Sequence, residues 1–115
     1  MKVTNLRNGA EIASELKAAD TFLKRLKGLM FQKSLNSGCG LHIIPCQSVH
    51  TFFMRFSIDV IYVNESLEVV GLDQRLSPYR FGKFRKQAKS VIEVESGVIE
   101  KTDTQIGDKL EIQKF

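Results

Sequence analysis

The sequence predicts a mostly β protein with a minor α+β character: one compact, antiparallel, barrel-like or sandwich-like domain with a single short helix near residues 21–31. Three observations predict this fold class. Short runs of β-branched and aromatic residues recur along the chain, an Asn-Gly pair indicates a hairpin near the N-terminus, and only one segment carries a helical apolar stripe. The 115 residues fit one domain, which we take to span residues 1–115.

The first hairpin is predicted by Asn8-Gly9, because a two-residue type I′ turn needs two residues that accept positive φ. This turn would join residues 1–7 to residues 10–18. The second arm fits either a helix or a strand by its periodicity, and the turn favours a strand. A helix is expected at 21–31, with an apolar stripe that consists of Phe22, Leu23, Leu26, Leu29 and Met30.

The later strands are predicted from composition and from the breaks between them. A short strand at 41–44 ends at Pro45, and an irregular loop is expected at 77–87. One helical turn fits at 97–102. The strands expected beyond residue 48 cover 49–54, 58–63, 67–73, 90–95 and 109–114.

The composition is that of a soluble globular protein, with 43% hydrophobic and 26% charged residues. The apolar runs are too short to span a bilayer, so no membrane partner is expected. The N-terminal residues lack the apolar core of a signal peptide. We therefore expect a cytoplasmic protein whose two cysteines stay reduced.

The protein is basic, with a formal net charge of +4, and its charges are unevenly distributed. No acidic residue occurs from Gln74 to Ser90, whereas acidic residues dominate from Val91 onward. Aromatic residues alternate with cations in the basic segment, a pattern typical of binding to single-stranded nucleic acid. The alternative is a solvated lid whose aromatic rings turn under onto the sheet. The candidate polyanion-binding residues are Arg75, Arg80, Lys83, Arg85 and Lys86.

A set of ordered segments resembles the bacterial and archaeal family called domain-of-unknown-function 192. The segments are Arg25-Leu26-Lys27-Gly28-Leu29-Met30, Pro45-Cys46, His50-Thr51-Phe52-Phe53-Met54, Ile58-Asp59-Val60-Ile61-Tyr62, Val91-Ile92-Glu93-Val94, Ser96-Gly97 and Ile106-Gly107-Asp108. The resemblance covers almost the whole chain and implies a small, mostly β, barrel-like domain. It implies no established activity, so no catalytic residue follows from it.

Both cysteines and both histidines lie between Gly38 and Val63, as Cys39, His42, Cys46 and His50. These are donors that zinc accepts, but the spacing lacks a CxxC pair. In a strand, Cys39 and His42 would also point to opposite faces. We therefore predict no metal site and no cofactor, with buried cysteine and polar histidines as the alternative to zinc.

An enzyme is the second hypothesis. Cys46 or Cys39 beside His50, oriented by Asp59, would imitate the Cys-His-Asp arrangement of a hydrolase. A reactive thiolate needs a cationic or helix N-terminal setting, and none is evident around Cys46. Whether the protein is an enzyme, and which residues would be catalytic, is left open by the sequence.

The leading hypothesis is a small binding module with a polar-lined site between His50 and Asp59. Asp59 lies within an apolar run, so its carboxyl group needs a cation or several N–H donors. It either locks the backbone by accepting N–H bonds from the turn after residues 55–57, or faces a ligand at the mouth of a pocket. The candidate ligand-binding residues are His50, Thr51, Met54, Arg55 and Asp59.

Overall fold

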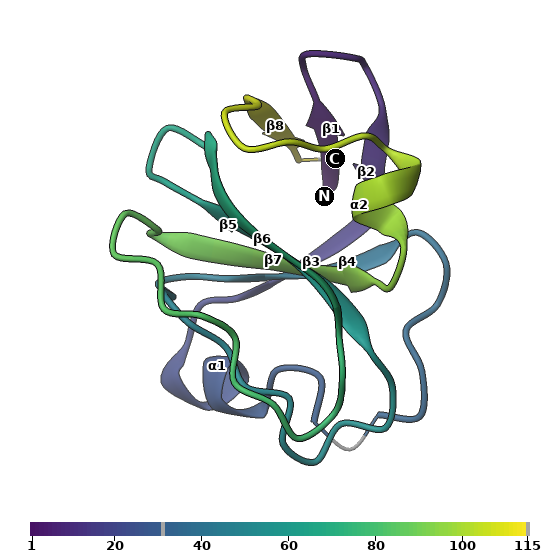
Figure 1. Ribbon diagram of the computed structural model, residues 1–115, viewed down its shortest axis with the longest axis vertical. Coiled ribbons are helices and arrows are strands. Elements are labelled where there is room, and N and C mark those ends of the chain that lie inside the picture. The colour runs from purple at the N-terminus through teal and green to yellow at the C-terminus, as the bar shows by residue number, and fades with distance from the viewer. Residues whose placement is uncertain (31, 115) are drawn as a thin grey trace.

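The computed structural model describes residues 1–30 and 32–114, and its strands form two sheets in a sandwich-like arrangement rather than a closed barrel (Figure 1). The larger sheet has five strands in the order β3-β4-β7-β5-β6. These strands are β3 (Glu15–Ala19), β4 (Cys39–Ile43), β7 (Ser90–Glu95), β5 (Ile58–Val63) and β6 (Val69–Leu76). Neighbouring strands are antiparallel, except that β3 and β4 run parallel.

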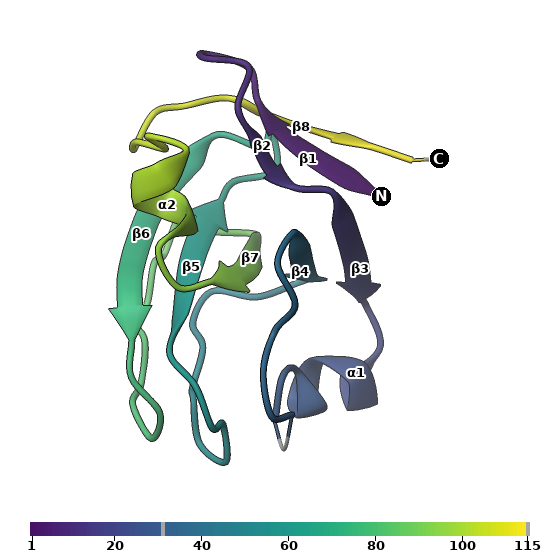
Figure 2. The same cartoon turned by 90° about the vertical axis from the view of Figure 1, so that its right-hand side faces the viewer.

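The smaller sheet has three antiparallel strands in the order β2-β1-β8 and brings the two ends of the chain together. Its strands are β2 (Glu11–Ala13), β1 (Lys2–Asn5) and β8 (Leu110–Gln113). The N-terminal hairpin is confirmed, but its turn is longer than two residues, and of the predicted pair only Gly9 has positive φ. Figure 2 shows this sheet at one end of the molecule, with helix α1 (Phe22–Lys27) toward the other end.

The central strands β5 and β7 are covered on both faces. Residues 58–63 are all buried, and so are residues 90–94. One face packs on the three-stranded sheet and on α2 (Val98–Lys101), with Ile61, Ile92 and Val94 in that core. The other face packs against Leu29, Val49 and Met54. A strand buried on both faces reads as a continuous apolar run, which is why the sequence located these two strands at their observed bounds.

The helix is shorter than predicted. Its apolar stripe was expected to be buried, but part of it is exposed. Thr21 caps the N-terminus by accepting a hydrogen bond from the Lys24 N–H, and Gly28 follows the last turn. Leu23 and Leu26 are 73% and 56% exposed, so they do not belong to the core. Leu29 is buried, but it lies beyond the helix. The Phe22 side chain and residue 31, both part of the prediction, lie outside the described part of the structure.

The predicted strand at 49–54 is wrong: this segment is a loop, with one isolated bridge between His50 and Phe81. Its β propensity is overridden by Thr51, which is fully buried and binds the 77–80 loop. The Thr51 hydroxyl donates to the Ser77 carbonyl oxygen at 2.6 Å and accepts from the Arg80 N–H at 2.8 Å. The expected irregular loop at 77–87 is confirmed. Within the described residues, no helix has the length and apolar character needed to cross a bilayer.

Candidate functional site

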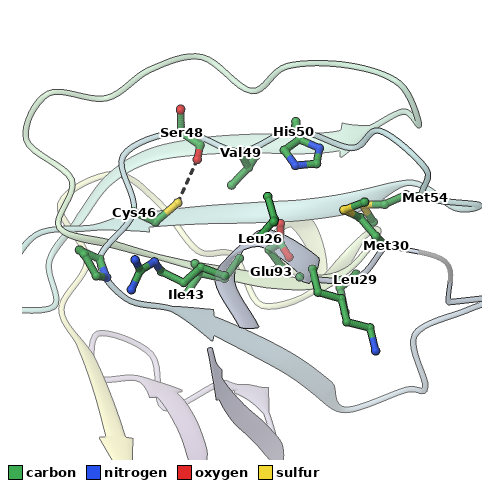
Figure 3. A pocket seen from close by; sticks show the side chains of 14 residues that line it. Leu26, Leu29, Met30, Ile43, Cys46, Ser48, Val49, His50, Met54 and Glu93 are labelled. Carbon is green, nitrogen blue, oxygen red and sulfur yellow. Dashed lines mark hydrogen bonds between the residues drawn. The ribbon is translucent and has the colours of Figure 1, made fainter. Parts of the chain in front are cut away.

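A pocket of about 290 Å³ opens between helix α1, the segment that follows it, and the β4–β5 loop (Figure 3). This volume is at the lower end of the range of small-molecule sites, roughly 300–1,000 Å³. Most of its wall is apolar. The apolar lining side chains belong to Leu26, Leu29, Met30, Ile43, Pro45, Val49 and Met54.

Glu93 is the buried polar group of this pocket. It lies in the middle of β7, paired with Leu41 of β4 and Val60 of β5, and is 3% exposed. Within the described part of the chain, its Oε1 atom is buried without a hydrogen-bond partner. Burial therefore raises the pKa of the Glu93 carboxyl from 4.5 to about 8, because the charged form is the one that loses hydration.

Gly28 gives the chain room beside this carboxyl group. Its φ of +48° is a left-handed value that glycine adopts readily, and it follows the last turn of α1. A Cβ atom at this position would lie 3.8 Å from Oε1 of Glu93 and 3.8 Å from the Arg25 carbonyl oxygen. The helix end thus passes directly over the carboxyl without offering it a side-chain partner.

The remaining polar lining is cationic or neutral. Arg25 and Lys27 contribute positive charge, and neither is in an ion pair with any residue that the structure describes. The guanidinium of Arg25 donates only long hydrogen bonds, to the carbonyl oxygens of Asp20 and Ile44 at 3.3 and 3.4 Å. A ligand with a neutral or anionic polar group is therefore favoured over a cationic one.

His50 and Cys46 also line the pocket. Nδ1 of His50 accepts a hydrogen bond from the Phe52 N–H at 3.2 Å, which places the ring proton on Nε2 in the neutral form. The Cys46 thiol donates to the Ser48 carbonyl oxygen at 2.9 Å (Figure 3). Burial raises the pKa of Cys46, so its thiolate is scarce near neutral pH.

Two of the five predicted ligand-binding residues, His50 and Met54, line this pocket. Thr51, Arg55 and Asp59 do not. Thr51 holds two loops together, and Arg55 is exposed. The Asp59–His50–Cys46 arrangement of the enzyme hypothesis is not assembled, because Asp59 lies on the opposite face of the sheet, paired with Val94.

Asp59 is fully buried and its carboxyl group holds three segments of backbone together. Oδ1 accepts from the Arg75 N–H at 2.8 Å, and Oδ2 accepts from the N–H groups of Gly97 and Ile99 at 3.1 and 2.9 Å. This geometry corresponds to the backbone lock considered from the sequence. The locked segments differ from the expected one, which was the turn at residues 55–57.

The Cys/His set is divided by the sheet. Strand register puts Cys39 on the face of Leu41, and His42 on the other face, where its Nε2 lies 2.9 Å from the Ser90 hydroxyl. Burial lowers the pKa of His42. Among the described residues, no group of three or more His, Cys, Asp or Glu side chains is arranged to hold a metal ion.

Sequence reasoning missed Glu93 although the signal was available. Val91-Ile92-Glu93-Val94 places a carboxyl within an apolar run, as Ile58-Asp59-Val60 does. The prediction counted Glu93 with the acidic half of the chain instead of with the core. In such a run both the odd-numbered and the even-numbered residues are apolar, so both faces of the strand are buried. An ionisable residue within it must therefore be buried on one face or the other.

The fold and the site together define a small two-sheet β protein with a ligand-sized pocket on one face of its larger sheet. The model of the family domain-of-unknown-function 192, described as Uncharacterized ACR, matches residues 3–112, and the chain belongs to this family. A UPF0127 protein of Pyrococcus furiosus is 40% identical over 112 residues, which cover 93% of this chain and 94% of the relative. A UPF0127 protein of Thermococcus sibiricus is 39% identical, over 93% of this chain and 71% of the relative.

A solved structure has the same fold. It is a protein of unknown function from Novosphingobium aromaticivorans, and it superposes with a TM-score of 0.83 at 22% sequence identity. The similarity covers 96% of this chain and 82% of that one. These relatives are described by family and not by reaction, so the function of this uncharacterised family is unknown and any role must be argued from the site.

Proposed function

We propose that the protein is a small binding module that holds one mostly apolar small molecule in the Glu93 pocket. The observation that carries the proposal is the buried Glu93 carboxyl, whose Oε1 has no partner among the described residues. Such a group lowers the stability of the fold, so its presence at the base of an apolar pocket suits a ligand that completes its hydrogen bonding.

The ligand must accept a hydrogen bond. With its pKa at about 8, the Glu93 carboxyl is protonated at neutral pH and its O–H donates. The cations Arg25 and Lys27 disfavour a ligand amine and suit a neutral or anionic group, in keeping with the anionic ligand expected from the sequence. The proposed ligand class is therefore a compact apolar molecule that carries a carbonyl or carboxylate group. We place the module in the cytoplasm, as the sequence predicts.

The test is a fluorescence titration with prodan, a naphthalene dye whose carbonyl group accepts hydrogen bonds and whose emission shifts to the blue in apolar surroundings. We expect Glu93→Met to lower prodan affinity by about tenfold, because methionine fills the same space without a donor. The matched control is Glu95→Met, on the same strand but exposed and outside the pocket lining. Affinity should also fall as the pH rises through about 8, where Glu93 ionises.

The binding site is located by amide chemical shifts, which should change in α1, at residues 28–30 and in β7. Equal prodan affinity in the wild-type protein and in Glu93→Met would contradict the proposal. So would shift changes confined to surfaces away from β7, because the dye would then bind without using the pocket.

A further inference from the structure

A second surface lies at the end of the molecule away from the three-stranded sheet, where the β4–β5 and β6–β7 loops run side by side in both views (Figures 1 and 2). Large aromatic side chains are exposed there to an unusual degree. Phe81 is 74% exposed, Tyr79 60%, Phe84 59% and Phe53 50%. Monomeric proteins seldom leave so much aromatic surface uncovered in one place unless it binds something.

The exposed rings are grouped rather than scattered. Phe52 packs edge-on against Phe81 with ring centroids 4.8 Å apart, and Tyr79 lies 6.2 Å from Phe52 and 6.1 Å from Phe53. The ring of His50 stacks on Phe52 at 5.6 Å. Rings from two separate loops therefore form one aromatic platform, here defined as Phe52, Phe53, Tyr79 and Phe81, and Phe84 is a further exposed ring of the β6–β7 loop.

The backbone beneath the platform is fixed. The N–H of Thr51 donates to the Arg80 carbonyl oxygen at 2.8 Å, and the N–H of Tyr79 donates to the Thr51 carbonyl oxygen at 2.9 Å. Phe53 and Tyr79 have φ values of 64° and 61°, which bulky residues rarely adopt. The loops thus hold two exposed aromatic residues in strained conformations, which is typical of functional surfaces.

The two loops that carry the platform also carry several cations, and no acidic residue occurs in either loop. Residues 44–58 and 74–92 contain no Asp or Glu. Of the predicted polyanion-binding residues, Arg75 pairs with Glu100, and Arg85 pairs with Asp73 and covers the Tyr62 ring. Those that form no ion pair with any described residue are Arg80, Lys83 and Lys86, and the β4–β5 loop adds Arg55.

We infer that the aromatic platform and its flanking cations form an interface for single-stranded nucleic acid. Exposed rings stack on bases, and this is possible only where the bases are unpaired, while Arg80 and Lys83 follow the phosphates. A bilayer surface is the less favoured partner. The exposed large residues of the platform are aromatic rather than aliphatic, and the chain has no tryptophan, a residue enriched at membrane interfaces.

The experiment is fluorescence anisotropy of a labelled oligothymidylate of about 12 nucleotides, a length within the range that one small domain covers. Phe81→Ala should weaken binding by about tenfold or more, because a stacking ring is lost. Phe84→Ala should also weaken it, and because Phe84 packs against no other ring among the described residues, its loss should not disturb the remaining rings. The matched control is Ile106→Ala, a 68% exposed side chain next to β8, which should leave affinity unchanged.

The charge component is tested by the salt dependence of binding. Replacing Arg80 and Lys83 together by glutamine should lower the slope of log affinity against log salt by about 1.4, since each phosphate contact to a single strand contributes about 0.7. Replacing Lys101 and Lys109 by glutamine changes the net charge equally and should leave the slope nearly unchanged. Circular dichroism of each variant establishes that it is folded.

Three results would overturn the inference. Equal affinity for the oligothymidylate and for a duplex of the same length would exclude base stacking. Binding that falls with the charge variants but not with Phe81→Ala or Phe84→Ala would leave only nonspecific attraction. Binding to phosphatidylserine vesicles that depends on Phe81, without binding to the oligothymidylate, would assign the surface to a bilayer instead.

Discussion

Two buried carboxyl groups lie on opposite faces of the same antiparallel strand pair, and they meet different surroundings. Asp59 of β5 accepts hydrogen bonds from three backbone N–H groups, and it faces the side of the sheet that α2 covers. Glu93 of β7 faces the side that Gly28 and the pocket side chains cover. Its Oε1 is buried without a partner in the described structure. One group therefore holds the backbone together, whereas the other is available to a ligand and lowers stability.

The largest effect should come from Glu93→Gln, measured as the free energy of unfolding against pH. In the unfolded wild-type chain Glu93 ionises near its ordinary pKa of 4.5, whereas in the folded protein it ionises only near 8. The folded state therefore binds more protons between these values, so wild-type stability falls as the pH rises from about 4.5 to about 8. The variant lacks this fall and should be more stable at pH 8 by several kcal/mol, to order of magnitude.

The control for this comparison is Glu95→Gln, an exposed position on the same strand. Burial lowers the pKa of His42, which removes stability as the pH falls below about 6.5, but this contribution is common to all three proteins and cancels in the differences. If the free energy of unfolding changed with pH in the same way in the wild type and in Glu93→Gln, the pKa of Glu93 would not be raised in the folded protein. The proposed contrast between the two carboxyl groups would then be wrong.

The second-largest effect should be a loss of folding stability in Asp59→Asn. The amide keeps one acceptor oxygen and turns an NH₂ group toward a backbone N–H, so at least one buried donor is left unpaired. Urea unfolding should show a loss of about 3 kcal/mol. Asp20→Asn, at an exposed position, should change stability by less than about 0.5 kcal/mol. A neutral result for Asp59→Asn would mean that the three backbone bonds are not what this carboxyl contributes.

The smallest effect concerns Gly28, which separates α1 from Glu93. Alanine fits sterically, since its Cβ would have no neighbour closer than 3.8 Å, so the cost arises from the positive φ and amounts to about 2 kcal/mol. Gly9→Ala has a positive φ of 74° and open space around it, and serves as the control far from the pocket. Thermal unfolding should show a loss for both variants, and prodan affinity should change only for Gly28→Ala. If prodan affinity changed in both variants, or in neither, Gly28 would have no specific role in the pocket.

Local composition predicted the elements that are buried on both faces and failed where tertiary contacts override propensity. The strands at 58–63 and 90–95 were predicted at their observed bounds. Residues 49–54 have the same β-rich composition but form a loop, because the Thr51 hydroxyl binds the 77–80 loop. The apolar stripe at Leu23 and Leu26 was predicted to be buried, but a six-residue helix leaves both side chains exposed.

The candidate site was predicted only in part, because its members come from segments that are distant in the sequence and meet only in the folded protein. His50 and Met54 were expected and line the pocket, while Glu93 was missed although it lies in an apolar run. The polyanion candidates were the cations of a segment in which aromatic and basic residues alternate, and their ion-pair partners were not considered. The sequence contains no sign that Arg75 and Arg85 pair with Glu100 and Asp73, because those pairs form between segments brought together by folding.

The β class, the two central strands and the burial of Asp59 could be predicted from local sequence, because a run in which successive residues are apolar leaves neither face of the strand exposed. The burial of Glu93 follows from the same pattern but was not predicted. The hydrogen-bond partners of each carboxyl group depend on the packing of distant segments. On one face, the first turn of α2 with its N-cap Gly97 and the end of β6 present N–H groups to Asp59. On the other, the helix end at Gly28 and apolar side chains lie near Oε1 of Glu93, and no described residue donates a hydrogen bond to it. Partners of a buried group come from distant segments, and these are fixed by packing rather than by neighbouring residues.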